Sequence, residues 1–282
     1  MPSPQEIRAA QDTAVAAALD KLDLDAKAAL VAGQDTWSLP AIDHIGLASV
    51  LMSDGPIGVR GRVWSGDVAI ALPSPTAQAA SWDPALARRS GRLLAQEARR
   101  KGVHVLLAPT INLHRSPLGG RHFEAHSEDP LLTGEMAASF VRGVQDGGVA
   151  TTAKHFVAND AETERMTVNN VIDERTLREL YLAPFETVVR AGAWGLMSAY
   201  NGVNGATMTE NSDLQNDLLR GEWGFDGFVV SDWTAARDTV RAALGGTDSA
   251  MPGPRTVYGE HLAAAVRDGR IDASVVDGLA RR

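Results

Sequence analysis

The sequence predicts an α/β fold of the (β/α)8 barrel type, irregular or incomplete, and three observations support that prediction. Short apolar runs alternate with longer segments of helical spacing six or seven times, which is typical of parallel βαβ units. The runs are apolar on both faces, as strands covered on both sides require. Polar residues follow the ends of at least four runs. In a barrel those ends meet at one rim, whereas an open doubly wound sheet would spread them along an edge.

The elements follow one another with little interruption, so we expect residues 1–282 to form a single barrel domain. Alanines interrupted by polar residues in the first thirty positions predict an amphipathic helix and no secretory signal. Strand-like runs lie at 49–55, 103–109, 149–156, 195–201, 227–233 and 245–253, with a weaker candidate at 68–75. Helical segments lie at 84–102, 131–148, 173–192, 211–224 and 233–244.

Composition excludes several classes of protein. The net charge of −8, without a dense Lys/Arg tract, argues against a nucleic-acid partner. No segment has the roughly 18 apolar residues that span a bilayer, so we expect no membrane insertion and a cytoplasmic location. The absence of cysteine excludes disulfides and thiolate metal sites. His122 and His126 are four residues apart, but they lie in a glycine-containing loop, and we expect no metal there.

Asp232 and Trp233 end the apolar run "GFVVSDW". Asp232 has a simple structural interpretation as a helix N-cap, since the next segment has helical spacing. A carboxylate on a barrel rim beside a tryptophan is also suited to carbohydrate chemistry. It can attack an anomeric carbon or stabilise an oxocarbenium-like transition state, while the indole forms an apolar platform for a sugar ring.

Two other strand ends carry charged residues. Asp54 and Arg60 lie in "DGPIGVR", where Asp-Gly-Pro favours a turn but the carboxylate can accept hydrogen bonds from sugar hydroxyls. Lys154 and His155 end another run and can orient hydroxyls beside a carboxylate. A structural ion pair and a satisfied core histidine are the alternatives. Lys154 on a barrel strand also permits a Schiff-base aldolase.

The loop 110–130 is long for a compact domain, and such loops are usually functional, so we expect it to form one wall of the site. Arg121 follows two glycines, and its planar guanidinium can grip a pair of hydroxyls. Arg165 has an alternative interpretation as a surface charge. The acids of the loop are more suited to bracing these bases than to chemistry: Glu124, Glu128 and Asp129.

Six stretches occur in the order found in a known family: "MSDGPIGVR", "LAPTINLHRSPLGGRHFEAHSEDP", "TTAKHFVANDAETERMTVNNVIDERTLRELYLAPFE", "LMSAYNGVNG", "GFDGFVVSDW" and "GGTDSAMPG". Through these stretches the sequence resembles glycoside hydrolase family 3, the family of β-glucosidases and related exo-acting β-glycosidases, over nearly its whole length. The resemblance implies an N-terminal (β/α)8-type barrel that cleaves terminal β-glycosides with retention and needs no cofactor.

The resemblance also assigns roles to residues. Asp232 matches the catalytic nucleophile of the family. Seven positions match those that surround the terminal, non-reducing sugar: Asp54, Arg60, Arg121, Lys154, His155, Arg165 and Tyr200. Met197 and Trp233 match residues that line the same pocket.

The sequence departs from the family pattern in its proton donor. Larger relatives use a glutamate from an α/β sandwich domain that follows the barrel, and the chain stops at "VVDGLARR", in the segment that leads out of the barrel. The single-domain branch uses a histidine after a "KHFPGHG"-like stretch, where this sequence has "KHFVANDAETE". We therefore expect the general acid in a missing C-terminal domain or a complementary chain. A non-catalytic sugar-binding barrel is the alternative.

Overall fold

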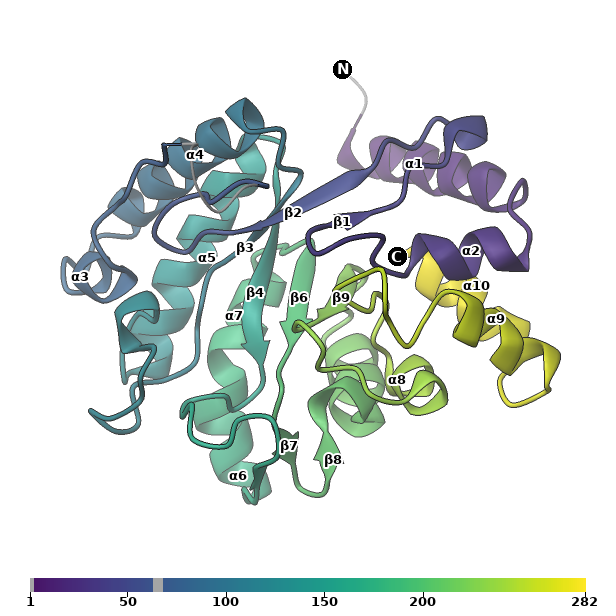
Figure 1. The fold of residues 1–282 in the computed structure, drawn as a ribbon. Helices are drawn as coiled ribbons and strands as arrows, with labels where there is room; N and C mark the ends of the chain where they lie inside the picture. The colour runs from purple at the N-terminus through teal and green to yellow at the C-terminus, as the bar shows by residue number, and fades with distance from the viewer. Residues whose placement is uncertain (1–2, 63–67) are drawn as a thin grey trace.

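The structure is a computed structural model and describes residues 3–62 and 68–282. A curled six-stranded sheet forms its centre (Figure 1), with the strand order β1-β2-β3-β4-β6-β9. The short β1 pairs with β2 in antiparallel fashion, and the other neighbours are parallel. The bounds are β1 Ser38–Leu39, β2 Val50–Asp54, β3 Val105–Leu107, β4 Ala150–Phe156, β6 Gly195–Ser198 and β9 Phe228–Ser231. The fold is therefore a (β/α)8-type barrel with irregular strands.

Two segments without regular strand structure continue the curl past β9. Val230 forms a parallel bridge with Ser249, and Ala250 forms one with Ala32. Residues 31–39 then lead back to β1, where the Gln34 amide donates to the Ser38 carbonyl at 2.9 Å. The predicted strand at 245–253 is thus reduced to isolated bridges, and this explains the irregularity of the barrel.

Helices surround the sheet on its outer side (Figure 1). α4, Pro84–Arg100, packs closely on α5, Pro130–Asp146, because Gly91 and Gly143 let the two backbones approach. The other described α- and π-helices are α1 Pro4–Leu19, α2 Leu24–Leu30, α3 Pro75–Ala79, α6 Glu174–Thr176, the π-helices η3 Leu177–Leu182 and η5 Asp213–Glu222, α7 Ala183–Arg190, α8 Thr239–Gly245, α9 Glu260–Arg267 and α10 Ala273–Arg281. Among the described residues no helix is both long enough and apolar enough to cross a membrane.

Short elements complete the described chain. They are a small second sheet of β5 Asn169–Asn170, β7 Gly202–Val203 and β8 Ala206–Thr207, and the single-turn helices η1 Asp43–Ile45, η2 His122–Glu124 and η4 Met208–Glu210.

Two sequence expectations were wrong. The N-terminal segment is not one helix, because α1, Pro4–Leu19, ends before Asp23 and that residue caps a separate helix, α2. No strand forms at 68–74, because Pro73 and Pro75 lack the N–H groups that a ladder needs, and α3 starts at Pro75. The predicted strand at 245–253 is present only as isolated bridges, and the remaining five predicted strands are confirmed within a few residues.

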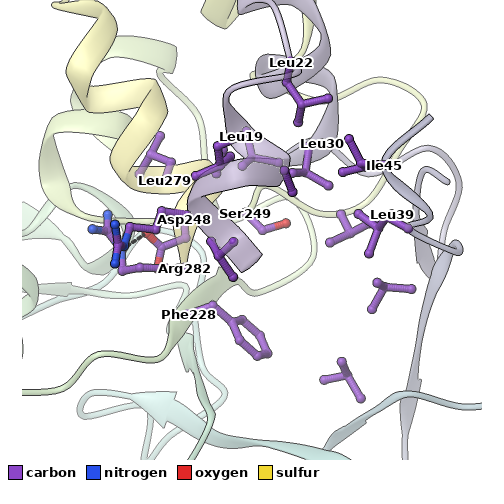
Figure 2. Close-up of a pocket in the computed structure, with 18 of the residues that line it drawn as sticks. Leu19, Leu22, Leu30, Leu39, Ile45, Phe228, Asp248, Ser249, Leu279 and Arg282 are labelled. Atoms are coloured by element: carbon purple, nitrogen blue, oxygen red, sulfur yellow. Dashed lines mark hydrogen bonds and ion pairs between the residues drawn. The ribbon is translucent and has the colours of Figure 1, made fainter. Parts of the chain in front are cut away.

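An apolar hollow of about 370 Å³ lies where the strands begin, between α1, α2 and α10 (Figure 2). Val50, Val105 and Phe228, the first residues of β2, β3 and β9, all line it. It therefore lies at the opposite end of the sheet from the polar residues that the sequence singles out.

Asp248 fixes the start of β9, the strand that leads to Asp232. Its Oδ2 accepts hydrogen bonds from the Val229 amide and from Arg220, each at 2.6 Å, and its Oδ1 accepts one from Arg282 at 2.7 Å. Burial raises the pKa of Asp248, while Arg220 and Arg282 oppose that rise. Two guanidinium groups and a backbone amide therefore offset the desolvation cost of this buried carboxylate.

We predict that Arg220→Leu destabilises the chain by about 3 kcal/mol, because it leaves a buried carboxylate with one cationic partner fewer. Urea unfolding followed by circular dichroism measures the change. Arg178→Leu is the matched control, because Arg178 pairs with Glu222 at 2.7 Å on an exposed surface and its loss should cost less than about 1 kcal/mol. Equal losses in the two variants would contradict the role of Asp248.

Candidate active site

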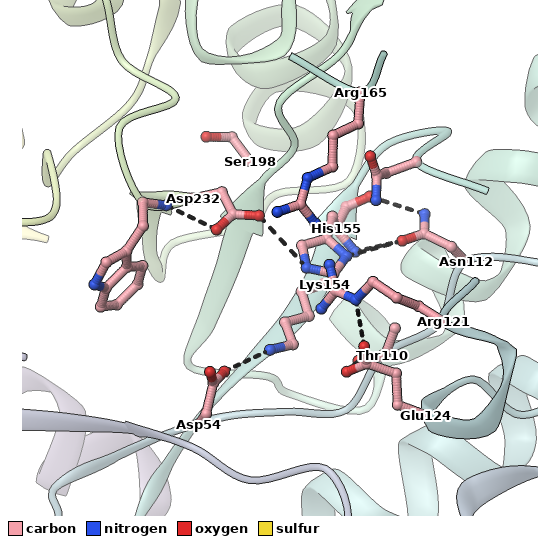
Figure 3. A network of polar contacts seen from close by, with 12 residues as sticks. Asp54, Thr110, Asn112, Arg121, Glu124, Lys154, His155, Arg165, Ser198 and Asp232 are labelled. Carbon is pink, nitrogen blue, oxygen red and sulfur yellow. Dashed lines mark hydrogen bonds and ion pairs between the residues drawn. The ribbon is translucent and has the colours of Figure 1, made fainter. Parts of the chain in front are cut away.

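The polar residues predicted from the sequence lie together at the C-terminal ends of the parallel strands (Figure 3). Asp54 is the last residue of β2, Lys154 and His155 lie near the end of β4, and Asp232 follows β9 directly. Residues separated by up to 178 positions, from 54 to 232, therefore share one small region. This is the face on which barrels of this type build their sites.

Lys154 and Asp54 form a buried ion pair across β4 and β2. The Lys154 Nζ lies 3.0 Å from Asp54 Oδ1, and the lysine side chain is 3% exposed. Burial by itself raises the pKa of Asp54, but Lys154, Arg60 and Arg121 outweigh it and bring the pKa below its ordinary value. Asp54 is therefore an anion at neutral pH and can accept hydrogen bonds from a ligand.

Asp232 is almost completely buried. Its Oδ1 accepts a hydrogen bond from the Trp233 amide at 2.7 Å. Within the described residues its Oδ2 has no hydrogen-bond partner of ordinary geometry, although the Tyr200 hydroxyl interacts with the carboxylate. Burial raises the pKa of Asp232 above its ordinary value, while Lys154 and Arg121 act in the opposite direction. One oxygen is thus held in place, and the other is left for a ligand.

The helix-cap interpretation of Asp232 is wrong. The helix that follows, α8, starts at Thr239, and the Asp238 carboxylate caps it by accepting from the Arg241 amide at 2.8 Å. Asp232 is separated from that helix by an irregular segment. Helix capping therefore does not explain why an aspartate occupies this position at the strand end.

His155 faces Asp232 from β4, with its Nε2 3.5 Å from Asp232 Oδ2. Burial lowers the pKa of His155 well below its ordinary value, and Arg121, Lys154 and Arg165 lower it further. The imidazole is therefore neutral at physiological pH. Its other nitrogen, Nδ1, lies 3.1 Å from Oδ1 of Asn112.

Two arginines from different loops complete the cluster. Arg121 donates to Glu124, which also accepts from the Thr110 hydroxyl at 3.1 Å. The bracing role expected for Glu124 is confirmed. Arg165 donates to Glu162 at 2.5 Å, and its guanidinium lies 4.6 Å from the centre of the Tyr200 ring. Arg165 therefore belongs to the cluster rather than to the general surface.

Trp233 and Met197 lie beside the charged residues. The Trp233 indole donates to the Thr36 carbonyl at 2.7 Å and packs against Trp37 with ring centres 5.3 Å apart. Met197 is buried in the same apolar cluster as Trp37 and Val230, against which Trp233 packs. Their predicted contact with a sugar remains a prediction.

A hollow of about 300 Å³ opens beside Asp54 and is lined by Arg60, Arg121, Phe123 and Glu124. The lining combines anionic, cationic and aromatic groups, which suits a small polyhydroxylated ligand. Loop 110–130 supplies three of these residues, as expected for one wall of a site.

The histidines of that loop have structural partners. His126 is buried and its Nδ1 contacts the Thr110 carbonyl at 3.1 Å, while His114 packs on His122. Burial lowers the pKa of His126 to about 4. Across residues 3–62 and 68–282, no three histidine or acidic side chains are grouped to hold a metal ion.

Sequence reasoning missed Asn112 and Thr110. Both lie just after β3, whose end carries no charged residue, so the run "LAPTIN" gave no signal of a site. Their partners, His155 and Glu124, are 43 and 14 residues away, and only the register between β3 and β4 brings Asn112 to His155.

These elements define an irregular α/β barrel with a buried cluster of charges at the C-terminal ends of its strands. Residues 28–282 match the model of the glycosyl hydrolase family 3 N terminal domain. The chain belongs to glycosyl hydrolase family 3.

Individual relatives agree with this assignment. A beta-glucosidase of Rhizobium radiobacter is 47% identical over 94% of this chain and 33% of its own length. The structure of beta-glucosidase 3B from Thermotoga neapolitana in complex with glucose matches with a TM-score of 0.90 and 38% identity, over 95% of this chain and 41% of that one. Beta-glucosidase from Kluyveromyces marxianus in complex with glucose matches with a TM-score of 0.92 and 39% identity, over 95% and 33%. The chain spans about a third of the curated relatives it matches.

We predict that Asp54→Asn destabilises the chain by about 2 kcal/mol at pH 7, because it leaves the Lys154 ammonium buried and unpaired. This loss of stability is smaller than the loss expected for a fully buried ion pair, because the Asp54 side chain is 34% exposed to solvent. The folded pKa of Asp54 lies below the unfolded value of about 3.9, so the pair stabilises above that value and its contribution is lost as pH falls through the folded pKa.

Urea unfolding of wild type and Asp54→Asn at pH 7 and pH 3.5 tests this dependence, and the difference should narrow at the lower pH. Asp43→Asn, at an exposed position, serves as the control and should change stability by less than about 0.5 kcal/mol. A difference that does not change with pH would contradict the assignment.

Proposed function

We propose that this chain is the nucleophile-bearing part of a retaining β-glucosidase that removes terminal, non-reducing β-D-glucosyl residues. The observation that carries the proposal is the Asp232 carboxylate, with one oxygen held by the Trp233 amide and the other without a hydrogen-bond partner of ordinary geometry among the described residues. The family membership and the names of the relatives support the substrate class. Asp54, Arg60 and Arg121 around the hollow supply acceptors and donors for sugar hydroxyls.

In this mechanism Asp232 Oδ2 attacks the anomeric carbon as the bond from that carbon to the leaving oxygen breaks. The products of the first step are a glycosyl ester on Asp232 and a leaving oxygen that must take up a proton. Water then attacks the same carbon, releases the sugar and restores the carboxylate. Lys154 and Arg121 favour the ionised nucleophile against the effect of burial.

We further propose that the proton donor for the leaving oxygen comes from outside residues 1–282. A retaining glycosidase needs a second carboxyl about 5 Å from the first. Asp54 is held as an anion by its cationic neighbours, and Glu124 and Glu162 are engaged by Arg121 and Arg165. The length of the relatives, about three times that of this chain, leaves room for a further domain.

The alternatives have less support. A Schiff-base aldolase needs a free amine, and the ammonium of Lys154 is committed to Asp54 at 3.0 Å. A non-catalytic sugar-binding barrel has no need of a buried carboxylate oxygen without a hydrogen-bond partner, since an uncompensated buried acceptor carries a desolvation cost.

We predict that 2,4-dinitrophenyl 2-deoxy-2-fluoro-β-D-glucoside labels Asp232, because its leaving group departs without a proton and the fluorine slows release of the ester. Peptide mass mapping after incubation locates the label. Asp232→Asn should abolish labelling, whereas Asp238→Asn, which keeps its helix cap, should not. A label on another residue, or none at all, would contradict the proposed nucleophile.

We also predict a strong dependence on the leaving group. The 282-residue chain should release dinitrophenol from its β-glucoside but cleave methyl β-glucoside at least about 100-fold less efficiently than a version extended by the remaining domains, since general acid catalysis contributes roughly 10²–10⁴-fold. Comparison of kcat/KM for both substrates and both proteins measures this. Equal activity of the two proteins on the methyl glucoside would place the acid within residues 1–282.

A further inference from the structure

We propose that Asn112 is a positioning residue that holds His155 in the tautomer with hydrogen on Nδ1, and so keeps His155 from hydrogen-bonding to the nucleophilic oxygen of Asp232. The inference rests on the proposed function for its catalytic meaning. The tautomer itself follows from contacts that do not depend on that function.

The first step is the orientation of the Asn112 amide. Its Nδ2 lies 3.0 Å from the carbonyl oxygen of His155, and its Oδ1 lies 2.8 Å from the backbone nitrogen of the same residue. A backbone N–H donates and a backbone carbonyl accepts, so the two ends of the amide cannot be exchanged. The backbone of His155 therefore makes Oδ1 the acceptor end of the side chain.

The second step is the state of the imidazole. His155 Nδ1 lies 3.1 Å from the same Oδ1, which can only accept, so Nδ1 must carry the hydrogen (Figure 3). A second hydrogen on the ring would add a positive charge to a buried site that already holds Lys154, Arg121 and Arg165. Nε2 is left with a lone pair.

The third step is what Nε2 faces. It lies 3.5 Å from Asp232 Oδ2, which has no hydrogen-bond partner of ordinary geometry among the described residues, although the Tyr200 hydroxyl interacts with the carboxylate. A hydrogen on Nε2 would be donated to Oδ2, which would stabilise the anion and reduce its nucleophilicity. With a lone pair instead, Nε2 accepts a hydrogen bond from a sugar hydroxyl, and Oδ2 remains available to the anomeric carbon.

Long-range ¹H–¹⁵N correlation spectra of the whole chain, labelled with ¹⁵N-histidine, test the tautomer directly. The signals of His155 are those that disappear in His155→Gln. We expect them to show the pattern of a neutral ring with hydrogen on Nδ1, the tautomer that a free imidazole favours less. A pattern with hydrogen on Nε2 would overturn the inference. Because this measurement uses the wild-type chain, it does not depend on the folding of any Asn112 variant.

The consequence for Asp232 is tested with a matched pair of variants. Asn211 is buried to the same extent as Asn112, accepts from the Leu214 amide and donates to the Val203 carbonyl, and neither of these bonds involves a histidine. Asn112→Asp places an anion beside Nδ1 and so favours a doubly protonated ring, whose Nε2–H binds Oδ2. Asn211→Asp makes the same chemical change without that effect.

The maximal rate constant for labelling of Asp232 by the dinitrophenyl fluoroglucoside should fall about tenfold or more in Asn112→Asp. The reason is that the hydrogen bond from His155 Nε2 to Asp232 Oδ2 must break before Oδ2 can attack the sugar. It should change less than about twofold in Asn211→Asp. Equal rates in the two variants would overturn the role of Asn112. Absence of labelling in wild type, with the Nδ1–H tautomer present, would instead refute the proposed function and leave the tautomer assignment intact.

Discussion

The cost of burying charge is the constraint that organises this molecule. Asp54, Lys154, His155 and Asp232 are brought together at the ends of three parallel strands, and all but the partly exposed Asp54 are buried. An isolated buried charge is strongly destabilising, so each must find an opposite charge or a hydrogen-bond donor. Lys154 takes Asp54 as its counterion, and Asp232 is solvated on one oxygen by a backbone amide. The remaining oxygen of Asp232 is the place where this solvation is incomplete.

The barrel supplies the rigidity that such an arrangement needs. Strand β9 leads directly to Asp232, and its start is tied to Asp248, which is itself held by Arg220 and Arg282. A second buried carboxylate, at the opposite end of the sheet, thus helps to define the position of the first. The loop 110–130 adds Arg121 and its brace Glu124 from the side. Both ends of the sheet therefore hold a buried carboxylate, which is fully hydrogen-bonded at Asp248 and hydrogen-bonded on one oxygen at Asp232.

The neutral state of His155 follows from the same constraint. Three cationic side chains surround the ring, and a fourth positive charge would have no counterion beyond Asp232. The Asn112 amide then decides which nitrogen holds the single hydrogen. In the proposed hydrolase, the cations that orient hydroxyls thus also keep the imidazole from competing with the substrate for the nucleophile.

The sequence by itself determined the fold class, most of the strands and the identity of the charged residues, because apolar runs that end in polar residues are a local pattern. It also predicted that Glu124 braces a basic residue and that Asp232 lies at the end of a strand. The tertiary structure decided the rest: that Arg165 stacks on Tyr200, that Asp238 and not Asp232 caps α8, and that Asn112 reaches His155. These contacts depend on strand register and barrel curvature, and such long-range geometry leaves no trace in the spacing of residues along the chain.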